Sequence, residues 1–127
     1  MADSAFHDHL NHPRNVGRID RPDGVGRGAG SQCADTMTIT IRIADDTIAD
    51  IAFDAQGCAE ILACGSAVTE LARGRHLDEA AEISAETVVA AMNGLPAEKR
   101  HLAQTAAEAL ANAIWDYIVR QIEDRTD

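Results

Sequence analysis

The stretch Thr36–Gln56, TMTITIRIADDTIADIAFDAQ, alternates apolar and polar residues on both sides of Asp45-Asp46. A period of two is typical of a β-strand with one buried face. The apolar face of the two runs is made by Met37, Ile39, Ile41 and Ile43, then Ala49, Ile51 and Phe53. We expect an antiparallel hairpin with an odd loop of about three residues, because a slip of one residue would turn every side chain to the other face.

Three chemically active residues flank this hairpin. Cys33 and Asp35 precede it in GSQCADTM, and Cys58 follows it. If the pairing continues outward, Cys33 lies opposite residue 57 or 59, so all three converge on one edge of the sheet, where neighbouring strands are about 5 Å apart. A thiol beside a carboxylate can be two ligands of a metal site, a nucleophile with an orienting acid, or a pair without a role. The spacing alone leaves these alternatives open.

The period becomes helical after Gly57. Apolar positions 61, 64, 68 and 71 share one stripe, and Gly74 ends it, which predicts a helix from about Ala59 to Arg73. Cys58 then stands at the helix N-terminus, where unpaired N–H groups and the helix dipole favour a thiolate. Cys64 lies on the apolar stripe and is predicted to be a packed core thiol.

The remaining segments complete an α+β fold. We expect a short helix around Phe6 and Leu10 in a mobile N-terminal segment of about residues 1–24, a first strand near Val25–Gly28, and two short helical pieces in HLDEAAEIS and SAETVVAAMNG, the second capped by Ser84. A long last helix runs from about Pro96 to Glu123. The prediction is a single domain, residues 1–127, with a small antiparallel sheet of about three strands packed against helices.

Composition narrows the class of function. The chain has 127 residues and a formal charge of -10, which argues against nucleic acid as a partner because phosphate backbones are held mainly by clustered Lys and Arg. No apolar run is long enough to span a membrane, and the polar start lacks the regions of a signal peptide. We therefore expect a cytoplasmic protein, in which three cysteines are free thiols or metal ligands instead of a disulfide framework.

Four stretches, in order, resemble the IscU/NifU-type iron-sulfur cluster assembly scaffolds. NHPRNVG resembles the family's N-P-R-N-x-G signature, and CADTM its C-G-D loop. GCAEILACGSAVTELARGRHLDEA resembles its second-cysteine segment with the following helix. LPAEKRH, at Leu95–His101, resembles the L-P-P-V-K-x-H-C segment that opens the last helix.

The resemblance implies a scaffold, not an enzyme, on which a transient [2Fe-2S] cluster is built. Its partners would be a cysteine desulfurase that delivers sulfur, an electron donor, and cluster-accepting apoproteins. Carried over residue by residue, the iron or zinc ligands would be Cys33, Asp35, Cys58 and His101. Thiolates and imidazole suit iron and zinc, whereas the carboxylate is a harder, more exchangeable ligand.

This chain departs from the family pattern at two places. Leu102 stands where the family has its third cysteine, a principal persulfide acceptor, so Cys33 or Cys58 would have to accept the sulfur. Ala97 and Glu98 replace Pro and Val in the chaperone-recognition segment, which argues against recruitment of a dedicated Hsp70-type chaperone. Two alternatives follow: a zinc-dependent sulfurtransferase accepting persulfide sulfur from a desulfurase, and a degenerate scaffold acting as a regulatory binding module.

Overall fold

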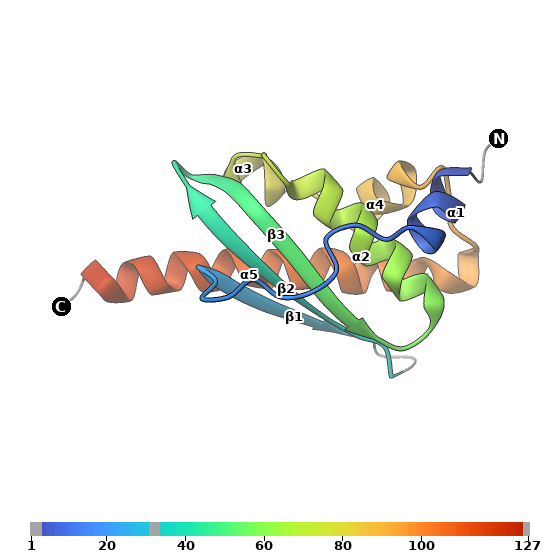
Figure 1. The fold of residues 1–127 in the computed structure, drawn as a ribbon, viewed down its shortest axis with the longest axis horizontal. Coiled ribbons are helices and arrows are strands. Elements are labelled where there is room, and N and C mark those ends of the chain that lie inside the picture. Colours follow the sequence, from blue (N-terminus) through green and yellow to red (C-terminus); the bar gives the residue numbers. More distant parts are fainter. Residues whose placement is uncertain (1–3, 31–33, 126–127) are drawn as a thin grey trace.

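A computed structural model describes residues 4–30 and 34–125 of the chain. Its elements, in chain order, are α1 (Ser4–Asn11), β1 (Gly24–Ala29), β2 (Thr36–Ala44), β3 (Thr47–Gln56), α2 (Ala59–Ala72), α3 (Leu77–Ala80), α4 (Ala85–Ala91), the 3₁₀ turn η1 (Ala97–Lys99) and α5 (Arg100–Arg125). The three strands form an antiparallel sheet in the order β1-β2-β3, with α2 and α5 on one face (Figure 1). The α+β class, the sheet and the long last helix are as predicted.

The hairpin joins its strands by a different device from the one expected. Its turn has only two residues, Asp45 and Asp46, both at positive φ of 53° and 58° as a type I′ turn requires. Arg42 pairs with Asp50, but Ile43 pairs with Ile48, so one residue of β3 bulges out of the ladder. The predicted three-residue loop was therefore wrong. The number of residues between the two apolar faces is still odd, because the bulge adds one residue to the two-residue turn.

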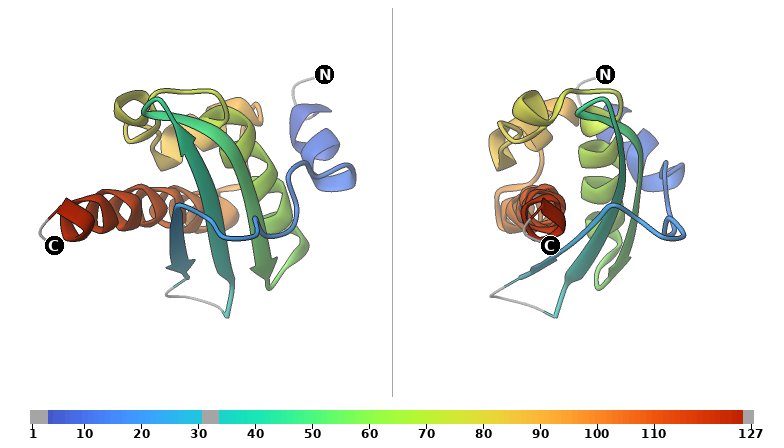
Figure 2. Two further views of the ribbon diagram at one scale, coloured as in Figure 1. Left: turned by 60° about the vertical axis from the view of Figure 1, so that its left-hand side comes forward. Right: turned by 90° about the vertical axis from the view of Figure 1, so that its left-hand side faces the viewer.

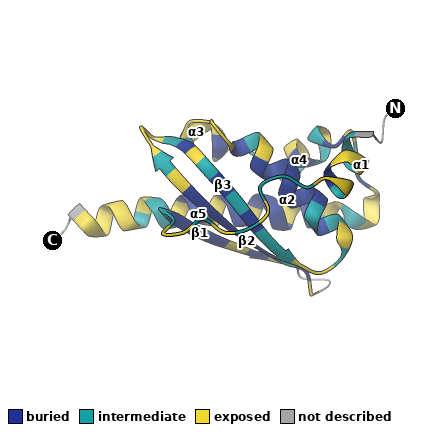
Figure 3. Cartoon of the chain, in the orientation of Figure 1, coloured by how far each residue is buried: buried dark blue, intermediate teal, exposed yellow. Residues whose placement is uncertain are grey.

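The core lies between the sheet and the two long helices. Ile39 pairs with Phe53 and Ile41 with Ile51 on the face that the sequence assigned to the interior, and all four are buried. Figure 3 shows the burial along the sheet and α2, in contrast to the exposed C-terminal end of α5, which extends beyond the sheet. Many of the buried side chains that the helices contribute are small alanines, which allows the helices to pack closely against the sheet.

Alternate glycines let α5 approach β1 closely. Gly24, Gly26 and Gly28 all pair with residues of the apolar face of β2, so a side chain at any of these positions would face the helix. A Cβ on Gly26 would lie only 2.7 Å from the Ala113 Cα and still closer to backbone atoms of Ala109 and Ala113. The helix backbone therefore occupies the space that side chains on this strand would need.

The other face of the sheet is also covered in part. Residues 12–23 run across it from α1 to β1 (Figure 2), and we call this segment the strap. The Ile19 N–H donates to Thr40 Oγ1 at 3.0 Å, and Gly17 donates to the Phe53 carbonyl at 2.7 Å. Thr38 and Thr40 are consequently buried, although a polar strand face was expected to be open. Mobility of the strap in solution stays a prediction.

The helices occur where the sequence placed them, with two adjustments. A 3₁₀ turn precedes α5, which begins at Arg100 instead of near Pro96. In α4 the capping box is formed by Ser84 and Thr87, the third residue of the helix. The Thr87 backbone N–H donates a hydrogen bond to the Ser84 side chain. Within the described residues, no helix is both long and apolar enough to cross a membrane.

Candidate functional site

Asp35 and Cys58 meet where the hairpin ends and α2 begins. The Cys58 backbone N–H donates to Asp35 Oδ1 at 2.7 Å, and the Gly30 N–H donates to the Asp35 carbonyl at 2.9 Å. Asp35 is 3% exposed. Gly57, at φ 136°, leaves room for the carboxylate, because a Cβ there would lie 2.6 Å from Asp35 Cγ. We call this arrangement the Asp35–Cys58 junction.

Cys58 is the N-cap residue of α2, as predicted, but its surroundings oppose ionisation. Partial burial raises the pKa of the Cys58 thiol, and the carboxylates of Asp35 and Glu60 raise it further. The hydrogen bond from the Ile61 backbone acts in the opposite direction and is outweighed. The expectation that the helix N-terminus would favour the thiolate was therefore wrong, because the thiol is partly buried and two carboxylates lie close to the sulfur.

Cys64, one and a half turns into α2, is a core residue as predicted. It is fully buried, and the burial raises the pKa of its thiol to about 12. A thiol in this state is neither a nucleophile nor a ready metal ligand at neutral pH, because both roles need the thiolate.

The two cysteines of α2 should differ sharply in reactivity. We expect iodoacetamide at pH 8 to alkylate Cys58 in the folded protein and to leave Cys64 unmodified until denaturant is added, since only Cys58 is partly exposed. Peptide mass spectrometry after a timed quench measures both rates in one sample. Modification of Cys64 at the rate of Cys58 in the native protein would contradict the core assignment.

His101 is the second residue of α5, and its backbone carbonyl accepts a hydrogen bond from the Thr105 hydroxyl at 3.2 Å. Lys99 Nζ lies 3.8 Å from Glu60 Oε1, which ties the turn before α5 to the start of α2. The elements that carry Cys58 and His101 are thus joined at one end of the molecule.

The predicted four-residue ligand set is only partly visible. Asp35 and Cys58 are in direct contact, whereas Cys33 lies outside the described residues. Among residues 4–30 and 34–125, no three His, Cys, Asp or Glu side chains are grouped closely enough to hold a metal ion. The assignment of Cys33, Asp35, Cys58 and His101 as ligands stays a prediction.

Leu102, the residue in place of the third family cysteine, is fully buried in the core. The side chain directly after His101 therefore fills apolar space between α5 and its neighbours. This position serves packing in the present chain.

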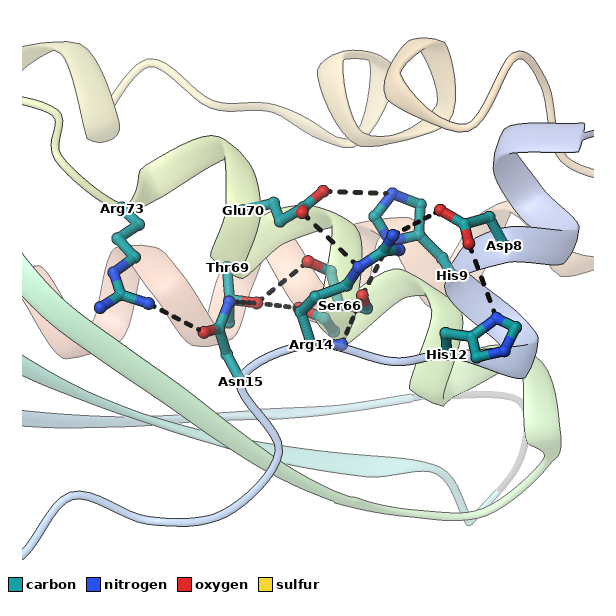
Figure 4. Close-up of polar contacts among 10 residues, drawn as sticks. Asp8, His9, His12, Arg14, Asn15, Ser66, Thr69, Glu70 and Arg73 are labelled. Atoms are coloured by element: carbon teal, nitrogen blue, oxygen red, sulfur yellow. Dashed lines mark hydrogen bonds and ion pairs between the residues drawn. The ribbon is translucent and has the colours of Figure 1, made fainter.

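A polar network that the sequence reasoning missed fastens the strap to α2 (Figure 4). Ser66 Oγ accepts the Arg14 backbone N–H at 2.9 Å and lies 2.7 Å from His9 Nδ1. Asn15 Nδ2 donates to Thr69 Oγ1 at 3.1 Å. The sequence feature that could have indicated this network is the pair Ser66 and Thr69, two polar residues within an otherwise apolar run of the helix. Their partners Arg14 and Asn15 belong to the NHPRN motif.

We expect His9 to make this attachment sensitive to pH. Burial lowers the pKa of His9 below its ordinary value, and the nearby Glu70 carboxylate opposes this only in part. Because the folded state favours neutral His9, its contribution to stability is present above the unfolded pKa of about 6.5 and is lost as the pH falls through the lower folded pKa. We expect NMR titration to give a His9 pKa below those of unfolded histidines.

The matched variant for this prediction is His9→Gln, which cannot take up the proton. Its free energy of unfolding should fall less than that of the wild type between pH 7 and pH 5. Equal slopes in the two proteins would show that His9 does not link the strap to pH.

Fold and site together define a small α+β domain that carries a cysteine–aspartate junction at the end of its hairpin. The chain belongs to the family of the NifU-like N terminal domain, whose family model matches residues 2–124. It is 45% identical over 116 residues to the iron-sulfur cluster assembly scaffold protein IscU 1 of Archaeoglobus fulgidus, covering 91% of this chain and 75% of that protein. It is 34% identical over 116 residues to the IscU scaffold protein of Aquifex aeolicus, covering 90% and 74%.

Solved structures agree on the fold. The N-terminal part of a nitrogen-fixing NifU-like protein from Brucella abortus superposes with a TM-score of 0.71 at 18% identity, covering 96% of this chain and 94% of that one. The family model and these relatives confirm, over nearly the whole chain, the family that four short motifs indicated.

Proposed function

We propose that this protein is a scaffold on which a transient [2Fe-2S] cluster is assembled and from which it is transferred to acceptor apoproteins. The Asp35–Cys58 junction carries the proposal, because it joins two of the motifs that resemble the family's ligand loops at one end of the sheet. The names of the Archaeoglobus and Aquifex relatives, both called cluster assembly scaffold proteins, support it.

The proposed ligands are the thiolates of Cys33 and Cys58, a ring nitrogen of His101 and a carboxylate oxygen of Asp35. This donor set fits an iron-sulfur cluster or zinc, since sulfur and nitrogen are the ligands that both prefer. Metal binding would have to displace the Cys58 proton, and the positive charge of an iron or zinc ion would favour the thiolate against the neighbouring carboxylates. Asp35 is the most exchangeable donor, which suits a site that must release its cargo.

The proposed partners follow from this role. A cysteine desulfurase would deliver sulfur to Cys33 or Cys58, an electron donor would supply electrons, and apoproteins would accept the cluster. The protein itself would act as a carrier and not as an enzyme, and we place it in the cytoplasm.

Transfer to an acceptor tests the proposal. The protein is incubated anaerobically with a cysteine desulfurase, cysteine, ferrous iron and a thiol reductant, then desalted and mixed with an apo-ferredoxin. We expect the circular dichroism of a ferredoxin [2Fe-2S] cluster to appear. With a chelator present to bind free iron, this signal should appear more slowly in a control mixture that lacks the scaffold. Ferredoxin maturation at the same rate with and without this protein would refute the scaffold role.

Asp35 should control the release of the cluster. Asp35→Asn keeps an oxygen that can accept the Cys58 N–H but replaces the exchangeable carboxylate, so it is a cleaner test than Asp35→Ala, which would also remove the support of the loop. We expect Asp35→Asn to assemble a cluster and to transfer it about tenfold more slowly, which corresponds to about 1.4 kcal/mol in the barrier. Transfer at the wild-type rate would remove Asp35 from the release step.

Two further candidates remain: the buried Leu102 favours a degenerate scaffold acting as a regulatory binding module, and the same donors could serve a zinc-dependent sulfurtransferase. Without the third family cysteine, zinc held by the same donors could position one thiolate of Cys33 or Cys58 to accept persulfide sulfur. This candidate predicts tightly bound zinc and persulfide formation without iron. Absence of bound metal and of persulfide would instead indicate the regulatory module.

A further inference from the structure

A groove unrelated to the Asp35–Cys58 junction lies along the second half of α2. Its volume is about 520 Å³, and its apolar lining residues are Ala67 and Leu71 of α2 and Ala91 of α4. Leu71 is about 20 Å of helical rise from Cys58, so the two sites occupy opposite ends of the helix. A groove of this size falls within the range that small organic ligands fill.

Three arginines line the groove: Arg14 from the strap, and Arg73 and Arg75 from the residues that directly follow α2. The chain has only 11 basic residues against 21 acidic ones, so this concentration is notable for its surface. Arg14 is neutralised by Asp8 and lies 3.7 Å from Glu70, while Arg73 lies 3.6 Å from Asp50. Figure 4 shows Arg14 and Arg73 on either side of Asn15.

Arg75 differs from the other two. Its Nε donates to the Leu71 carbonyl at 2.7 Å, which fixes the guanidinium against the C-terminal turn of α2. Within the described part of the chain it has no carboxylate at ion-pair distance. A guanidinium has five N–H donors, and only one is used here, so the planar fork remains available for an oxyanion.

We propose that this groove binds a small organic anion, a carboxylate or phosphate group carried on an apolar body. Arg75 would hold the oxyanion with help from Arg73, and the body would lie on Ala67, Leu71 and Ala91. Glu70 lines the same groove and disfavours a second anionic group elsewhere on the ligand, which limits the ligand to a single such group. Because Arg14 and Asn15 also line the groove, a bound anion would lie between the strap and α2.

The test uses two probes that share one apolar body, benzoate and phenyl phosphate, with benzylammonium as the cationic counterpart. Each is titrated into the ¹⁵N-labelled full-length protein, and amide shifts are followed by NMR. We expect saturable shifts of the Leu71, Arg75 and Ala91 amides with a millimolar dissociation constant for at least one anion and none for the cation. Whichever anion binds more tightly shows whether carboxylate or phosphate is the preferred group.

Variants separate this site from general charge attraction. Arg75→Gln should weaken the binding of the better anion about tenfold, as expected for loss of a charge-assisted hydrogen bond. Arg27→Gln, which removes an exposed arginine of β1, should leave it unchanged. Glu70→Gln should strengthen binding by removing the opposing charge. The proposal is overturned if neither anion gives saturable shifts, if benzylammonium binds equally well, or if Arg27→Gln weakens binding as much as Arg75→Gln.

Discussion

Gly26→Val should destabilise the protein by about 3 kcal/mol, at the upper end of the usual cost of overpacking a core. Valine is a better strand former than glycine, so local propensity alone predicts the opposite sign. The cost arises because the new Cβ would point into the backbone of α5, which cannot yield as a flexible side chain would. Urea denaturation followed by far-UV circular dichroism measures the free energy of unfolding.

The matched control is Arg27→Val, which introduces the same side chain at the next residue of the same strand. Arg27 pairs with Thr38 on the opposite face of the sheet and is exposed, so this variant should stay within about 0.5 kcal/mol of the wild type. If Gly26→Val were as stable as Arg27→Val, the close approach of α5 to β1 would be wrong.

The second large effect concerns cluster formation. Cys58→Ala should reduce the amount of cluster retained after desulfurase-driven assembly to less than about a tenth of the wild-type value, because the proposed set of four ligands would be left with three donors and only one thiolate. The visible absorption and circular dichroism of the desalted protein measure the cluster. The fold should survive, since Cys58 is only partly buried.

Cys64→Ala provides the comparison on the same helix. Removing the buried sulfur should cost about 1 kcal/mol of stability but leave cluster assembly unchanged. A reversed result, with the cluster lost in Cys64→Ala and kept in Cys58→Ala, would move the site into the core and contradict the assignment of Cys58.

Local periodicity was enough to predict most of the fold. The alternation around Ile39 and Phe53 identified the paired strands and their buried face, and the stripe through Ile61 and Val68 identified α2. The loop length could not be predicted, because a longer turn or a bulge supplies the same odd count. The glycines of β1 are visible as a period of two, but their purpose depends on which helix lies against that strand.

The chemistry of the site was less predictable than its position. The meeting of Asp35 and Cys58 followed from the hairpin register. The direction of the Cys58 pKa did not, since it depends on burial and on the distances to two carboxylates. The attachment of the strap through Ser66 was also out of reach, because its partners are separated from it by more than fifty residues.

The most direct test of the central claim is the iron, acid-labile sulfide and zinc content of the wild-type protein, purified anaerobically and analysed before and after assembly with a cysteine desulfurase, cysteine and ferrous iron. The scaffold account predicts iron and sulfide in equal amounts after assembly, with the signal lost in Cys58→Ala and kept in Cys64→Ala. Zinc alone, with no sulfide gained and no dependence on Cys58, would contradict it.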